Sequence, residues 1–270
     1  MRILVIADIH ANLHALNSVL MDAKDNYDVA WCLGDIVGYG PDPNECIQAI
    51  KELPGFICLA GNHDYATVGN MDLIENKPVF VIGAGPSLPS CISILKKYKK
   101  ITKIVADGAT KAMIENNLKP DIVVTDLDGD IKSLKKAGRT NTMMIVHAHG
   151  DNTEKIHLVK YFKNCIGTTQ TKSVGKVHNF GGFTDGDRCV FLASHFKAKK
   201  IILLGMDFGT RIGKYSKTRV LNRTTKIKKL RRGKKLLEWL AKKSESQLYS
   251  TTKIKGLTKK IGRASCRERV

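Results

Sequence analysis

Short runs of apolar, often β-branched residues alternate along this chain with stretches in which apolar residues recur every three or four positions. The short runs are typical of buried strands, and the longer stretches are typical of amphipathic helices. We predict strands over residues 2–7, 28–33, 56–60, 79–82, 101–106, 120–125, 143–146 and 200–204, with helices between them. This alternation predicts an α/β fold with a doubly wound, mostly parallel sheet.

The same pattern divides the chain into two α/β units. Residues 1–75 contain three strands and predict a partial sheet, and residues 76–262 contain enough strands for a complete one. Residues 219–243 carry an apolar stripe among many Lys and Arg residues, which predicts a basic helix near the C-terminus. Residues 263–270 have no apolar period and are expected to be disordered or a non-native extension.

Composition is that of a soluble globular protein, with 43% hydrophobic and 26% charged residues in a chain of 270. No apolar run approaches the ~20 residues that a membrane-spanning helix needs. Asp8 and His10 interrupt the apolar start before it could form a signal peptide, so we expect a cytoplasmic protein. The seven cysteines show no CxxC spacing, which favours reduced thiols in the core over a zinc site or a disulfide framework.

The net charge of +20 is concentrated in one part of the chain. Residues 196–270 hold 24 Lys and Arg against 4 Asp and Glu, so the first 195 residues are neutral. This excess indicates an anionic partner, either nucleotide phosphates or nucleic acid. A basic helix packed on its own domain is the alternative. The chain contains no known nucleic-acid-binding motif.

Metal-type ligands follow all three predicted strands of the first unit. They are Asp8, His10, Asp35, Asn62 and His63, a mixed oxygen and nitrogen set that suits a two-metal hydrolase. Residues 8–10, 34–43 and 61–64 resemble the motifs of the calcineurin-like metallophosphoesterases. The resemblance implies that Asp8 and His10 bind one divalent metal such as Mn²⁺, Asp35 bridges two metals, Asn62 binds the second, and His63 assists the leaving group.

The second half of such a phosphoesterase, which would supply further histidine ligands, has no clear counterpart in this chain. The nearest match is His147-Ala148-His149, which lacks the glycine that precedes the family's motif. We therefore expect an incomplete phosphoesterase site in residues 1–75. The alternative is a phosphoesterase in which His147 and His149 complete the metal site.

Three acidic residues spaced two apart, Asp126, Asp128 and Asp130, follow the predicted strand at 120–125. Carboxylates at the carboxyl end of a parallel strand lie where such sheets bind ligands, and hard oxygen ligands suit Mg²⁺ brought in with a nucleotide phosphate. An acidic turn that only caps the next helix is the alternative. Glycines at 83 and 85, between a strand and a helix, expose backbone N–H groups that suit phosphate.

Six motifs in order make the second unit resemble the archaeal MptE-like 6-hydroxymethyl-7,8-dihydropterin pyrophosphokinases. They are residues 83–88, 106–110, 120–130, 147–152, 182–188 and 205–209, and their order is also similar to that of thiamine pyrophosphokinase. The resemblance implies transfer of a pyrophosphoryl group from ATP to the pterin hydroxymethyl group, with Mg²⁺ and release of AMP. A phosphoesterase and a basic nucleic-acid-binding protein remain as alternative functions.

These motifs supply the candidate site residues of the second unit. Asp126, Asp128, Asp185 and Asp187 are the expected Mg²⁺ ligands, although helix capping is an alternative for Asp185 and Asp187. Asp126, Asp128, Asp185, His147 and His149 are the expected catalytic residues. Gly83, Gly85, Ser87, Asp107, Asn152 and Asp207 are the expected contacts to ATP or pterin. Metal binding is an alternative for Asp107. A structural, hydrogen-bonded role is the alternative for His147 and His149.

Overall fold

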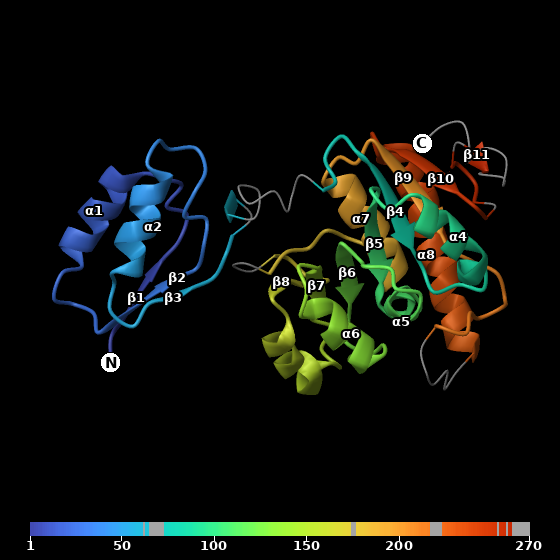
Figure 1. The fold of residues 1–270 in the computed structure, drawn as a ribbon, viewed down its shortest axis with the longest axis horizontal. Coiled ribbons are helices and arrows are strands. Elements are labelled where there is room, and N and C mark those ends of the chain that lie inside the picture. The colour runs from blue at the N-terminus through green and yellow to red at the C-terminus, as the bar shows by residue number, and fades with distance from the viewer. Residues whose placement is uncertain are drawn as a thin grey trace. The chain divides into compact units, whose positions relative to one another are not determined.

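The computed structural model describes residues 1–61, 63–64, 73–173, 177–216, 223–252, 254–257 and 259–260. The chain forms two compact units, Met1–Leu73 and Ile74–Val270 (Figure 1). We call them unit 1 and unit 2. Each has its own parallel sheet, and unit 2 has the larger core.

Unit 1 is a three-stranded parallel sheet with two helices. Its elements are β1 (Ile3–Ile6), α1 (Leu13–Asp22), β2 (Val29–Cys32), α2 (Pro43–Lys51) and β3 (Ile57–Cys58), and the strand order is β1-β2-β3. The Asn12 side chain accepts a hydrogen bond from the Ala15 N–H at 3.0 Å and so caps α1. Ile6, Leu16 and Ile50 are buried in the core between the sheet and these helices.

The sheet of unit 1 also carries an exposed apolar row. Val5, Trp31 and Ile57 are direct neighbours across the three strands, and they are 54%, 38% and 54% exposed. Side chains alternate between the two faces of a strand, so these residues point away from the face that includes Ile6 and Cys32. Among its described residues, unit 1 therefore has a packed core on one face of its sheet.

Unit 2 contains a larger parallel sheet. Its strands are β4 (Pro78–Ile82), β5 (Thr102–Ala106), β6 (Ile122–Thr125), β7 (Met143–His147), β8 (Asn164–Thr168), β9 (Lys200–Leu204), β10 (Gln247–Ser250) and β11 (Lys259–Lys260). The helical segments are α4 (Leu88–Lys97), α5 (Asp107–Glu115), α6 (Ile131–Gly138), the 3₁₀ helix η1 (Thr153–Tyr161), α7 (Asp185–His195) and α8 (Arg223–Lys243).

The strand order of unit 2, β11-β10-β9-β4-β5-β6-β7-β8, contains a switch point. The chain runs outward from β4 to β8 and then returns to place β9 on the other side of β4. In such sheets the connections at the switch point diverge, which opens a crevice at the carboxyl ends of the two strands. The segments that follow β4 and β9 therefore flank a natural binding position.

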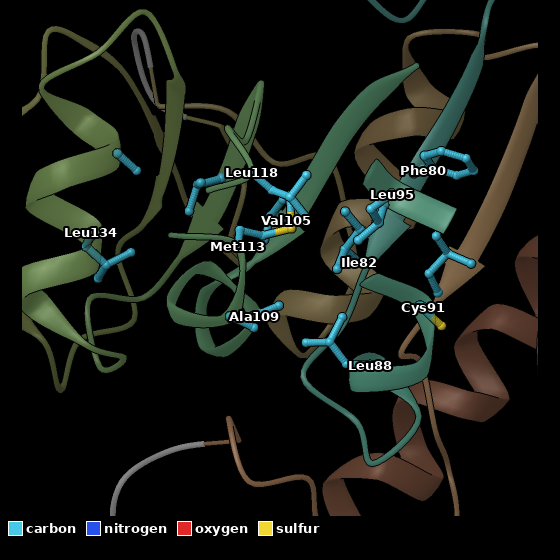
Figure 2. Close-up of a cluster of buried hydrophobic side chains, with 14 of the residues drawn as sticks. Phe80, Ile82, Leu88, Cys91, Leu95, Val105, Ala109, Met113, Leu118 and Leu134 are labelled. Atoms are coloured by element: carbon cyan, nitrogen blue, oxygen red, sulfur yellow. The ribbon is translucent and has the colours of Figure 1, made fainter. Parts of the chain in front are cut away.

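The core of unit 2 lies on both faces of this sheet. On one face, Leu88 and Leu95 of α4 and Met113 of α5 pack with Phe80 and Val105 of the strands (Figure 2). On the other face, α7 lies against β4, β5, β6 and β9, and α8 packs on α7. The central strands are thus covered on both sides, which explains their nearly continuous apolar sequences.

The predicted fold class, two α/β units with parallel sheets and a basic C-terminal helix, is confirmed. Helix α8 falls within the predicted range 219–243, of which residues 219–222 are outside the described part. The predicted tail 263–270 also lies outside it. The strands β8, β10 and β11 were not predicted. None of the helices in the described part of the chain is long and apolar enough to cross a membrane.

Candidate active site

Four carboxylates converge at the carboxyl ends of β5 and β6. Asp107 is the first residue of α5, Asp126 and Asp128 follow β6, and Asp185 is the first residue of α7. One oxygen of each lies within 4.8 Å of the others. The structure thus brings Asp126, Asp128 and Asp185 together with Asp107, for which the sequence left both a metal and a substrate role open.

The loop after β6 is built around Asp107, which is almost completely buried. Its Oδ2 accepts hydrogen bonds from the Thr125 hydroxyl at 2.8 Å, the Gly129 N–H at 3.0 Å and the Asp128 N–H at 3.3 Å. The Thr125 hydroxyl oxygen in turn accepts the Leu127 N–H at 2.8 Å. These bonds fix the backbone that carries Asp126 and Asp128.

Electrostatic repulsion between these carboxylates is visible at Asp185. Its pKa is raised well above the usual range, first by burial and then by the charges of Asp126 and Asp107, against the opposing influence of Arg188 and Lys226. A divalent cation would remove this repulsion, because four carboxylate oxygens are the hard donors that Mg²⁺ and Ca²⁺ prefer. The cluster therefore fits a bound metal chemically.

Asp187 has a different role from its neighbour. It is fully buried, and its carboxylate accepts hydrogen bonds from the Phe183 and Thr184 N–H groups at 2.6 and 2.8 Å and from the Thr184 hydroxyl. Thr184 and Asp187 form a capping box at the start of α7. Asp187 lies outside the four-carboxylate cluster, so the structure replaces its expected metal role with helix capping. Asp130 likewise caps α6 through Ser133.

A pocket of about 100 Å³ adjoins the cluster at the switch point between β4 and β9. Asp128 and Asp185 line one part of it, and three cationic side chains line another: Arg211 from the segment after β9, and Lys226 and Lys229 from α8. Burial lowers the pKa of Lys226, while the nearby Asp185 and Asp126 charges act in the opposite direction. The pocket joins negative and positive walls, as a metal–polyphosphate site requires.

The predicted glycine turn lies in this pocket. A Cβ added at Gly83 or Gly85 would overlap the Gly205 carbonyl oxygen, so both glycines allow the turns after β4 and β9 to touch. The Ser87 N–H and hydroxyl both donate to Asp207 Oδ2, at 2.8 and 2.7 Å. Asp207 therefore holds the turn in place, and the side chains of Ser87 and Asp207 are hydrogen-bonded to each other.

The candidate residues after β7 fall into two groups. Asn152 donates from Nδ2 to the carbonyl oxygens of Asp126 and His147, both at 2.8 Å, and accepts the His149 N–H at 3.0 Å. Asn152 thus supports the loops structurally, whereas the sequence predicted a contact to the ligand. His149 is partly exposed, with its Nδ1 3.0 Å from Asp151.

His147 is 1% exposed, and its Nδ1 lies 3.2 Å from the Thr168 hydroxyl. Its Nε2 has no hydrogen-bond partner among the described residues. The pKa of His147 is lowered to about 4 by burial, by the Arg188 charge and by His149. The imidazole is therefore neutral at pH 7.

Sequence reasoning missed four basic residues: Arg188, Arg211, Lys226 and Lys229. Arg188 was visible inside the 182–188 motif, where a cation stands directly after two acidic residues at a helix start. The lysines of α8 gave only a general signal, the basic charge of residues 196–270. Nothing in that pattern distinguishes the lysines that face the pocket from those that face solvent.

In unit 1, hydrogen bonds hold the motif segments together around Asp35. Asp35 is buried, and its Oδ1 accepts the His63 N–H at 2.9 Å. The Asp64 carboxylate accepts the N–H groups of Asp35, Ile36, Val37 and Gly61. The rings of His10, His63 and Tyr39 lie with their centroids 4.7–5.0 Å apart.

These residues of unit 1 do not form a tight ligand cluster. Asp8 is 72% exposed at its side chain, and its Oδ1 lies 3.9 Å from His10 Nε2. Across the described residues, the four-aspartate cluster of unit 2 is the single group whose ligand atoms all converge within 4.8 Å. The expected ligand Asn62 lies outside the described residues.

Comparison with known proteins relates unit 2 to one family. The sequence profile of the 6-hydroxymethylpterin diphosphokinase MptE-like family matches residues 58–213. The chain is 49% identical over 189 residues to the 6-hydroxymethyl-7,8-dihydropterin pyrophosphokinase of Methanocaldococcus jannaschii, covering 64% of this chain and 78% of that protein. It is 45% identical over 196 residues to the enzyme of the same name from Pyrococcus furiosus, covering 70% and 83%.

The chain belongs to the MptE-like diphosphokinase family. It is therefore an enzyme of the pyrophosphokinase class, and the family match covers the segments that carry Asp107, Asp126, Asp128 and Asp185. The profile ends at residue 213, before α8 begins. The pocket beside the carboxylate cluster is thus lined in part by Lys226 and Lys229, from a helix beyond the matched segment.

A different relative matches over a shorter length. The chain is 51% identical over 72 residues to an uncharacterized protein of Methanocaldococcus jannaschii, covering 26% of this chain and 29% of that protein. A solved metallophosphoesterase from Sphaerobacter thermophilus is 27% identical, over 46% of this chain and 59% of that one, with a TM-score of 0.24. That score is too low to establish a shared fold.

Proposed function

We propose that unit 2 transfers a pyrophosphoryl group from ATP to 6-hydroxymethyl-7,8-dihydropterin with Mg²⁺ and releases AMP. The hydroxymethyl oxygen forms a bond to the β-phosphorus of ATP, and the bond from that phosphorus to the oxygen shared with the α-phosphate breaks. AMP leaves with the bridging oxygen, and the hydroxyl proton goes to solvent. The observation that carries the proposal is the four-carboxylate cluster beside a pocket with a cationic wall.

The carboxylates would hold the metal in this reaction. Asp126, Asp128, Asp185 and Asp107 supply oxygen ligands at one place, and Mg²⁺ bound there would neutralise charge on the phosphates. Asp107 also has a positioning role, because its Oδ2 fixes the loop that carries Asp126 and Asp128. Phosphoryl-type transfer needs placement and charge neutralisation more than covalent catalysis.

The cationic wall would bind the phosphates of ATP. Lys226 and Arg211 line the pocket opposite the carboxylates, and the glycine turn between them and β4 leaves room for a ligand close to the backbone. Lysine neutralises phosphate as a compact charge, and arginine binds it through a planar fork. This arrangement favours ATP phosphates over nucleic acid as the anionic partner of these particular basic residues.

Turnover of purified full-length protein with ATP, MgCl₂ and 6-hydroxymethyl-7,8-dihydropterin tests the proposal, with nucleotide products separated by chromatography. We expect AMP, not ADP, at one equivalent per pterin consumed, and no AMP when MgCl₂ is replaced by EDTA. Asp126→Asn should reduce the rate at least about 100-fold, the range seen when a preorganised charged group is lost from an active site. Release of ADP, or no turnover with any hydroxymethyl pterin, would refute the reaction.

For unit 1 we propose a partial metallophosphoesterase-like unit that does not hydrolyse phosphoesters by itself. The support is the ordered Asp35–His63–Asp64 network, the apolar row of Val5, Trp31 and Ile57, and the match to 29% of one relative. With Mn²⁺ and bis-p-nitrophenyl phosphate we expect no hydrolysis above that of Asp35→Asn. Hydrolysis that depends on both Mn²⁺ and Asp35 would show that the site is complete.

A further inference from the structure

Arg188 is a buried arginine close to three aspartates of the site. The residue is 7% exposed and lies on the first turn of α7. Among the described residues, its guanidinium makes no hydrogen bond and no ion pair within 4 Å. Asp185, Asp187 and Asp126 are close enough to influence its pKa, which burial lowers. A buried charge without a close partner is costly, so such an arrangement is typical of a group kept for a ligand.

The space beside Arg188 is small and mostly apolar. A cavity of about 10 Å³ is lined by Arg188 together with Val124, Ile145, Thr168 and Phe180, among others. This volume holds roughly one oxygen-sized group. It is separate from the cationic pocket at β4 and β9 and lies toward β6, β7 and β8. The carboxylate cluster therefore has a cationic wall on one flank and Arg188 on the other.

His147 provides a second unsatisfied polar group on the same flank. It ends β7, its Nε2 has no partner among the described residues, and the Arg188 charge is near enough to lower its pKa. Gly182 keeps this flank compact, since a Cβ there would overlap the backbone and Cγ of Arg188. The glycine has φ +89°, a conformation that favours glycine over other residues.

We infer that Arg188 binds the acceptor substrate, donating two parallel hydrogen bonds to the carbonyl oxygen O4 and the ring nitrogen N5 of the dihydropterin. This inference rests on the function proposed above. O4 and N5 are adjacent acceptors on one edge of the ring, in the same arrangement as O6 and N7 of guanine, which arginine binds through both donors. The cavity accommodates one ring-edge oxygen, with the ring itself outside it.

This orientation also explains where the reacting group lies. The hydroxymethyl group is attached to the carbon next to N5, so the edge held by Arg188 carries the nucleophile beside it. Asp126 and Asp185, which neighbour Arg188, belong to the carboxylate cluster. Arg188 thus turns the hydroxyl toward the metal-bound phosphates and selects rings that have both acceptors.

Calorimetric titration of the full-length protein with 6-hydroxymethyl-7,8-dihydropterin tests the inference, under anaerobic conditions and with MgCl₂. We expect Arg188→Met to weaken pterin binding by about tenfold or more, the usual cost of losing a bidentate arginine contact, and to leave ATP binding within twofold. Arg188→Lys should also weaken pterin binding, because an ammonium group lacks the planar fork. The matched control is Arg139→Met, because Arg139 is an exposed arginine of unit 2.

A second measurement changes the ligand and compares the wild type with Arg188→Met. The 5-deaza analogue of the substrate lacks the N5 acceptor, so the wild type should bind it more weakly than the natural ring, whereas Arg188→Met should bind the two equally. Equal pterin binding by Arg188→Met and wild type, or a loss of ATP binding instead, would overturn the inference. So would a wild type that does not distinguish the analogue. Arg188-dependent pterin binding without AMP release would support this inference and refute only the proposed reaction.

Discussion

Gly129 lies directly against the Asp107 carboxylate. Its N–H donates to Asp107 Oδ2 at 3.0 Å, and a Cβ added at Gly129 would overlap Oδ1 of the same group. Asp107 belongs to β5–α5 and Gly129 to the loop after β6, so the contact joins the two strand ends that carry the carboxylate cluster. The glycine is needed here because the loop must approach the carboxylate without a side chain.

Gly129→Ala should therefore damage the site without any change to a metal ligand. We expect the methyl group to displace Asp107 and the loop that carries Asp128, which should reduce kcat by about 100-fold, as small misplacements in an active site do. AMP formation as a function of MgCl₂ concentration measures the effect. Gly209→Ala is the control, because a Cβ there meets nothing within 4 Å. Wild-type kcat in Gly129→Ala would show that the contact is not needed.

The central strands could be predicted because burial on both faces leaves a continuous apolar sequence. Residues 200–204 (Lys-Ile-Ile-Leu-Leu) show this clearly, and β9 has the predicted bounds. The strands β8 and β10 lie nearer the edges of the sheet, and their sequences contain Asn164, Gly167 and Gln247 in place of an apolar run. Parallel pairing with β7 and β9 makes them strands, and that tertiary contact leaves little trace in a local pattern.

Asp185 and Asp187 are two residues apart, but their mutation should have different effects on the stability of the protein and on its Mg²⁺ affinity. Asp185→Asn removes a carboxylate whose pKa is raised by burial and by like charges, so the metal-free protein should unfold no more easily, while Mg²⁺ affinity falls. Asp187→Ala removes the cap of α7 and should lower the free energy of unfolding by about 1–2 kcal/mol.

Urea unfolding in EDTA and calorimetric Mg²⁺ titration separate the two effects. Asp151→Ala, at an exposed carboxylate, is the control for both measurements. If Asp187→Ala abolished Mg²⁺ binding and left the stability unchanged, the capping assignment would be wrong.

The site residues that could be predicted are those whose chemical type is unusual at their position. Acidic residues after an apolar strand gave Asp126 and Asp128 directly. The sequence could not separate Asp185 from Asp187, since both stand in the first turn of a helix and only the capping geometry decides between them. Lys226 was not predicted because its role depends on how α8, far along the chain, lies over the pocket.

Lys226 should affect ATP and not the pterin. It is partly buried and lines the cationic pocket, where burial lowers its pKa, so its charge is available to a phosphate bound there. We expect Lys226→Met to raise KM for ATP about tenfold, in the range that removal of one charged hydrogen-bond partner produces, with KM for the pterin unchanged. Lys235→Met, at an exposed position of the same helix, is the control. Steady-state kinetics with each substrate varied in turn measures both KM values, and an unchanged KM for ATP would contradict the prediction.

His147 should make the stability of the protein depend on pH. Its folded pKa of about 4 lies below the unfolded value of about 6.5, so below pH 6.5 the unfolded chain takes up a proton that the folded protein does not. The free energy of unfolding should therefore fall as the pH drops from about 6.5 to about 4, by up to about 3 kcal/mol from this group alone. Above pH 6.5 its contribution is constant.

His147→Gln should remove this part of the pH dependence. Urea unfolding of wild type and variant at a series of pH values measures it, and the difference between the two curves isolates His147 from the aspartates, which titrate in both proteins. His157→Gln, at an exposed histidine of η1, should keep the wild-type slope. A His147→Gln curve parallel to that of the wild type between pH 6.5 and 4 would mean that the imidazole takes up its proton in the folded state, where Arg188 and burial oppose it.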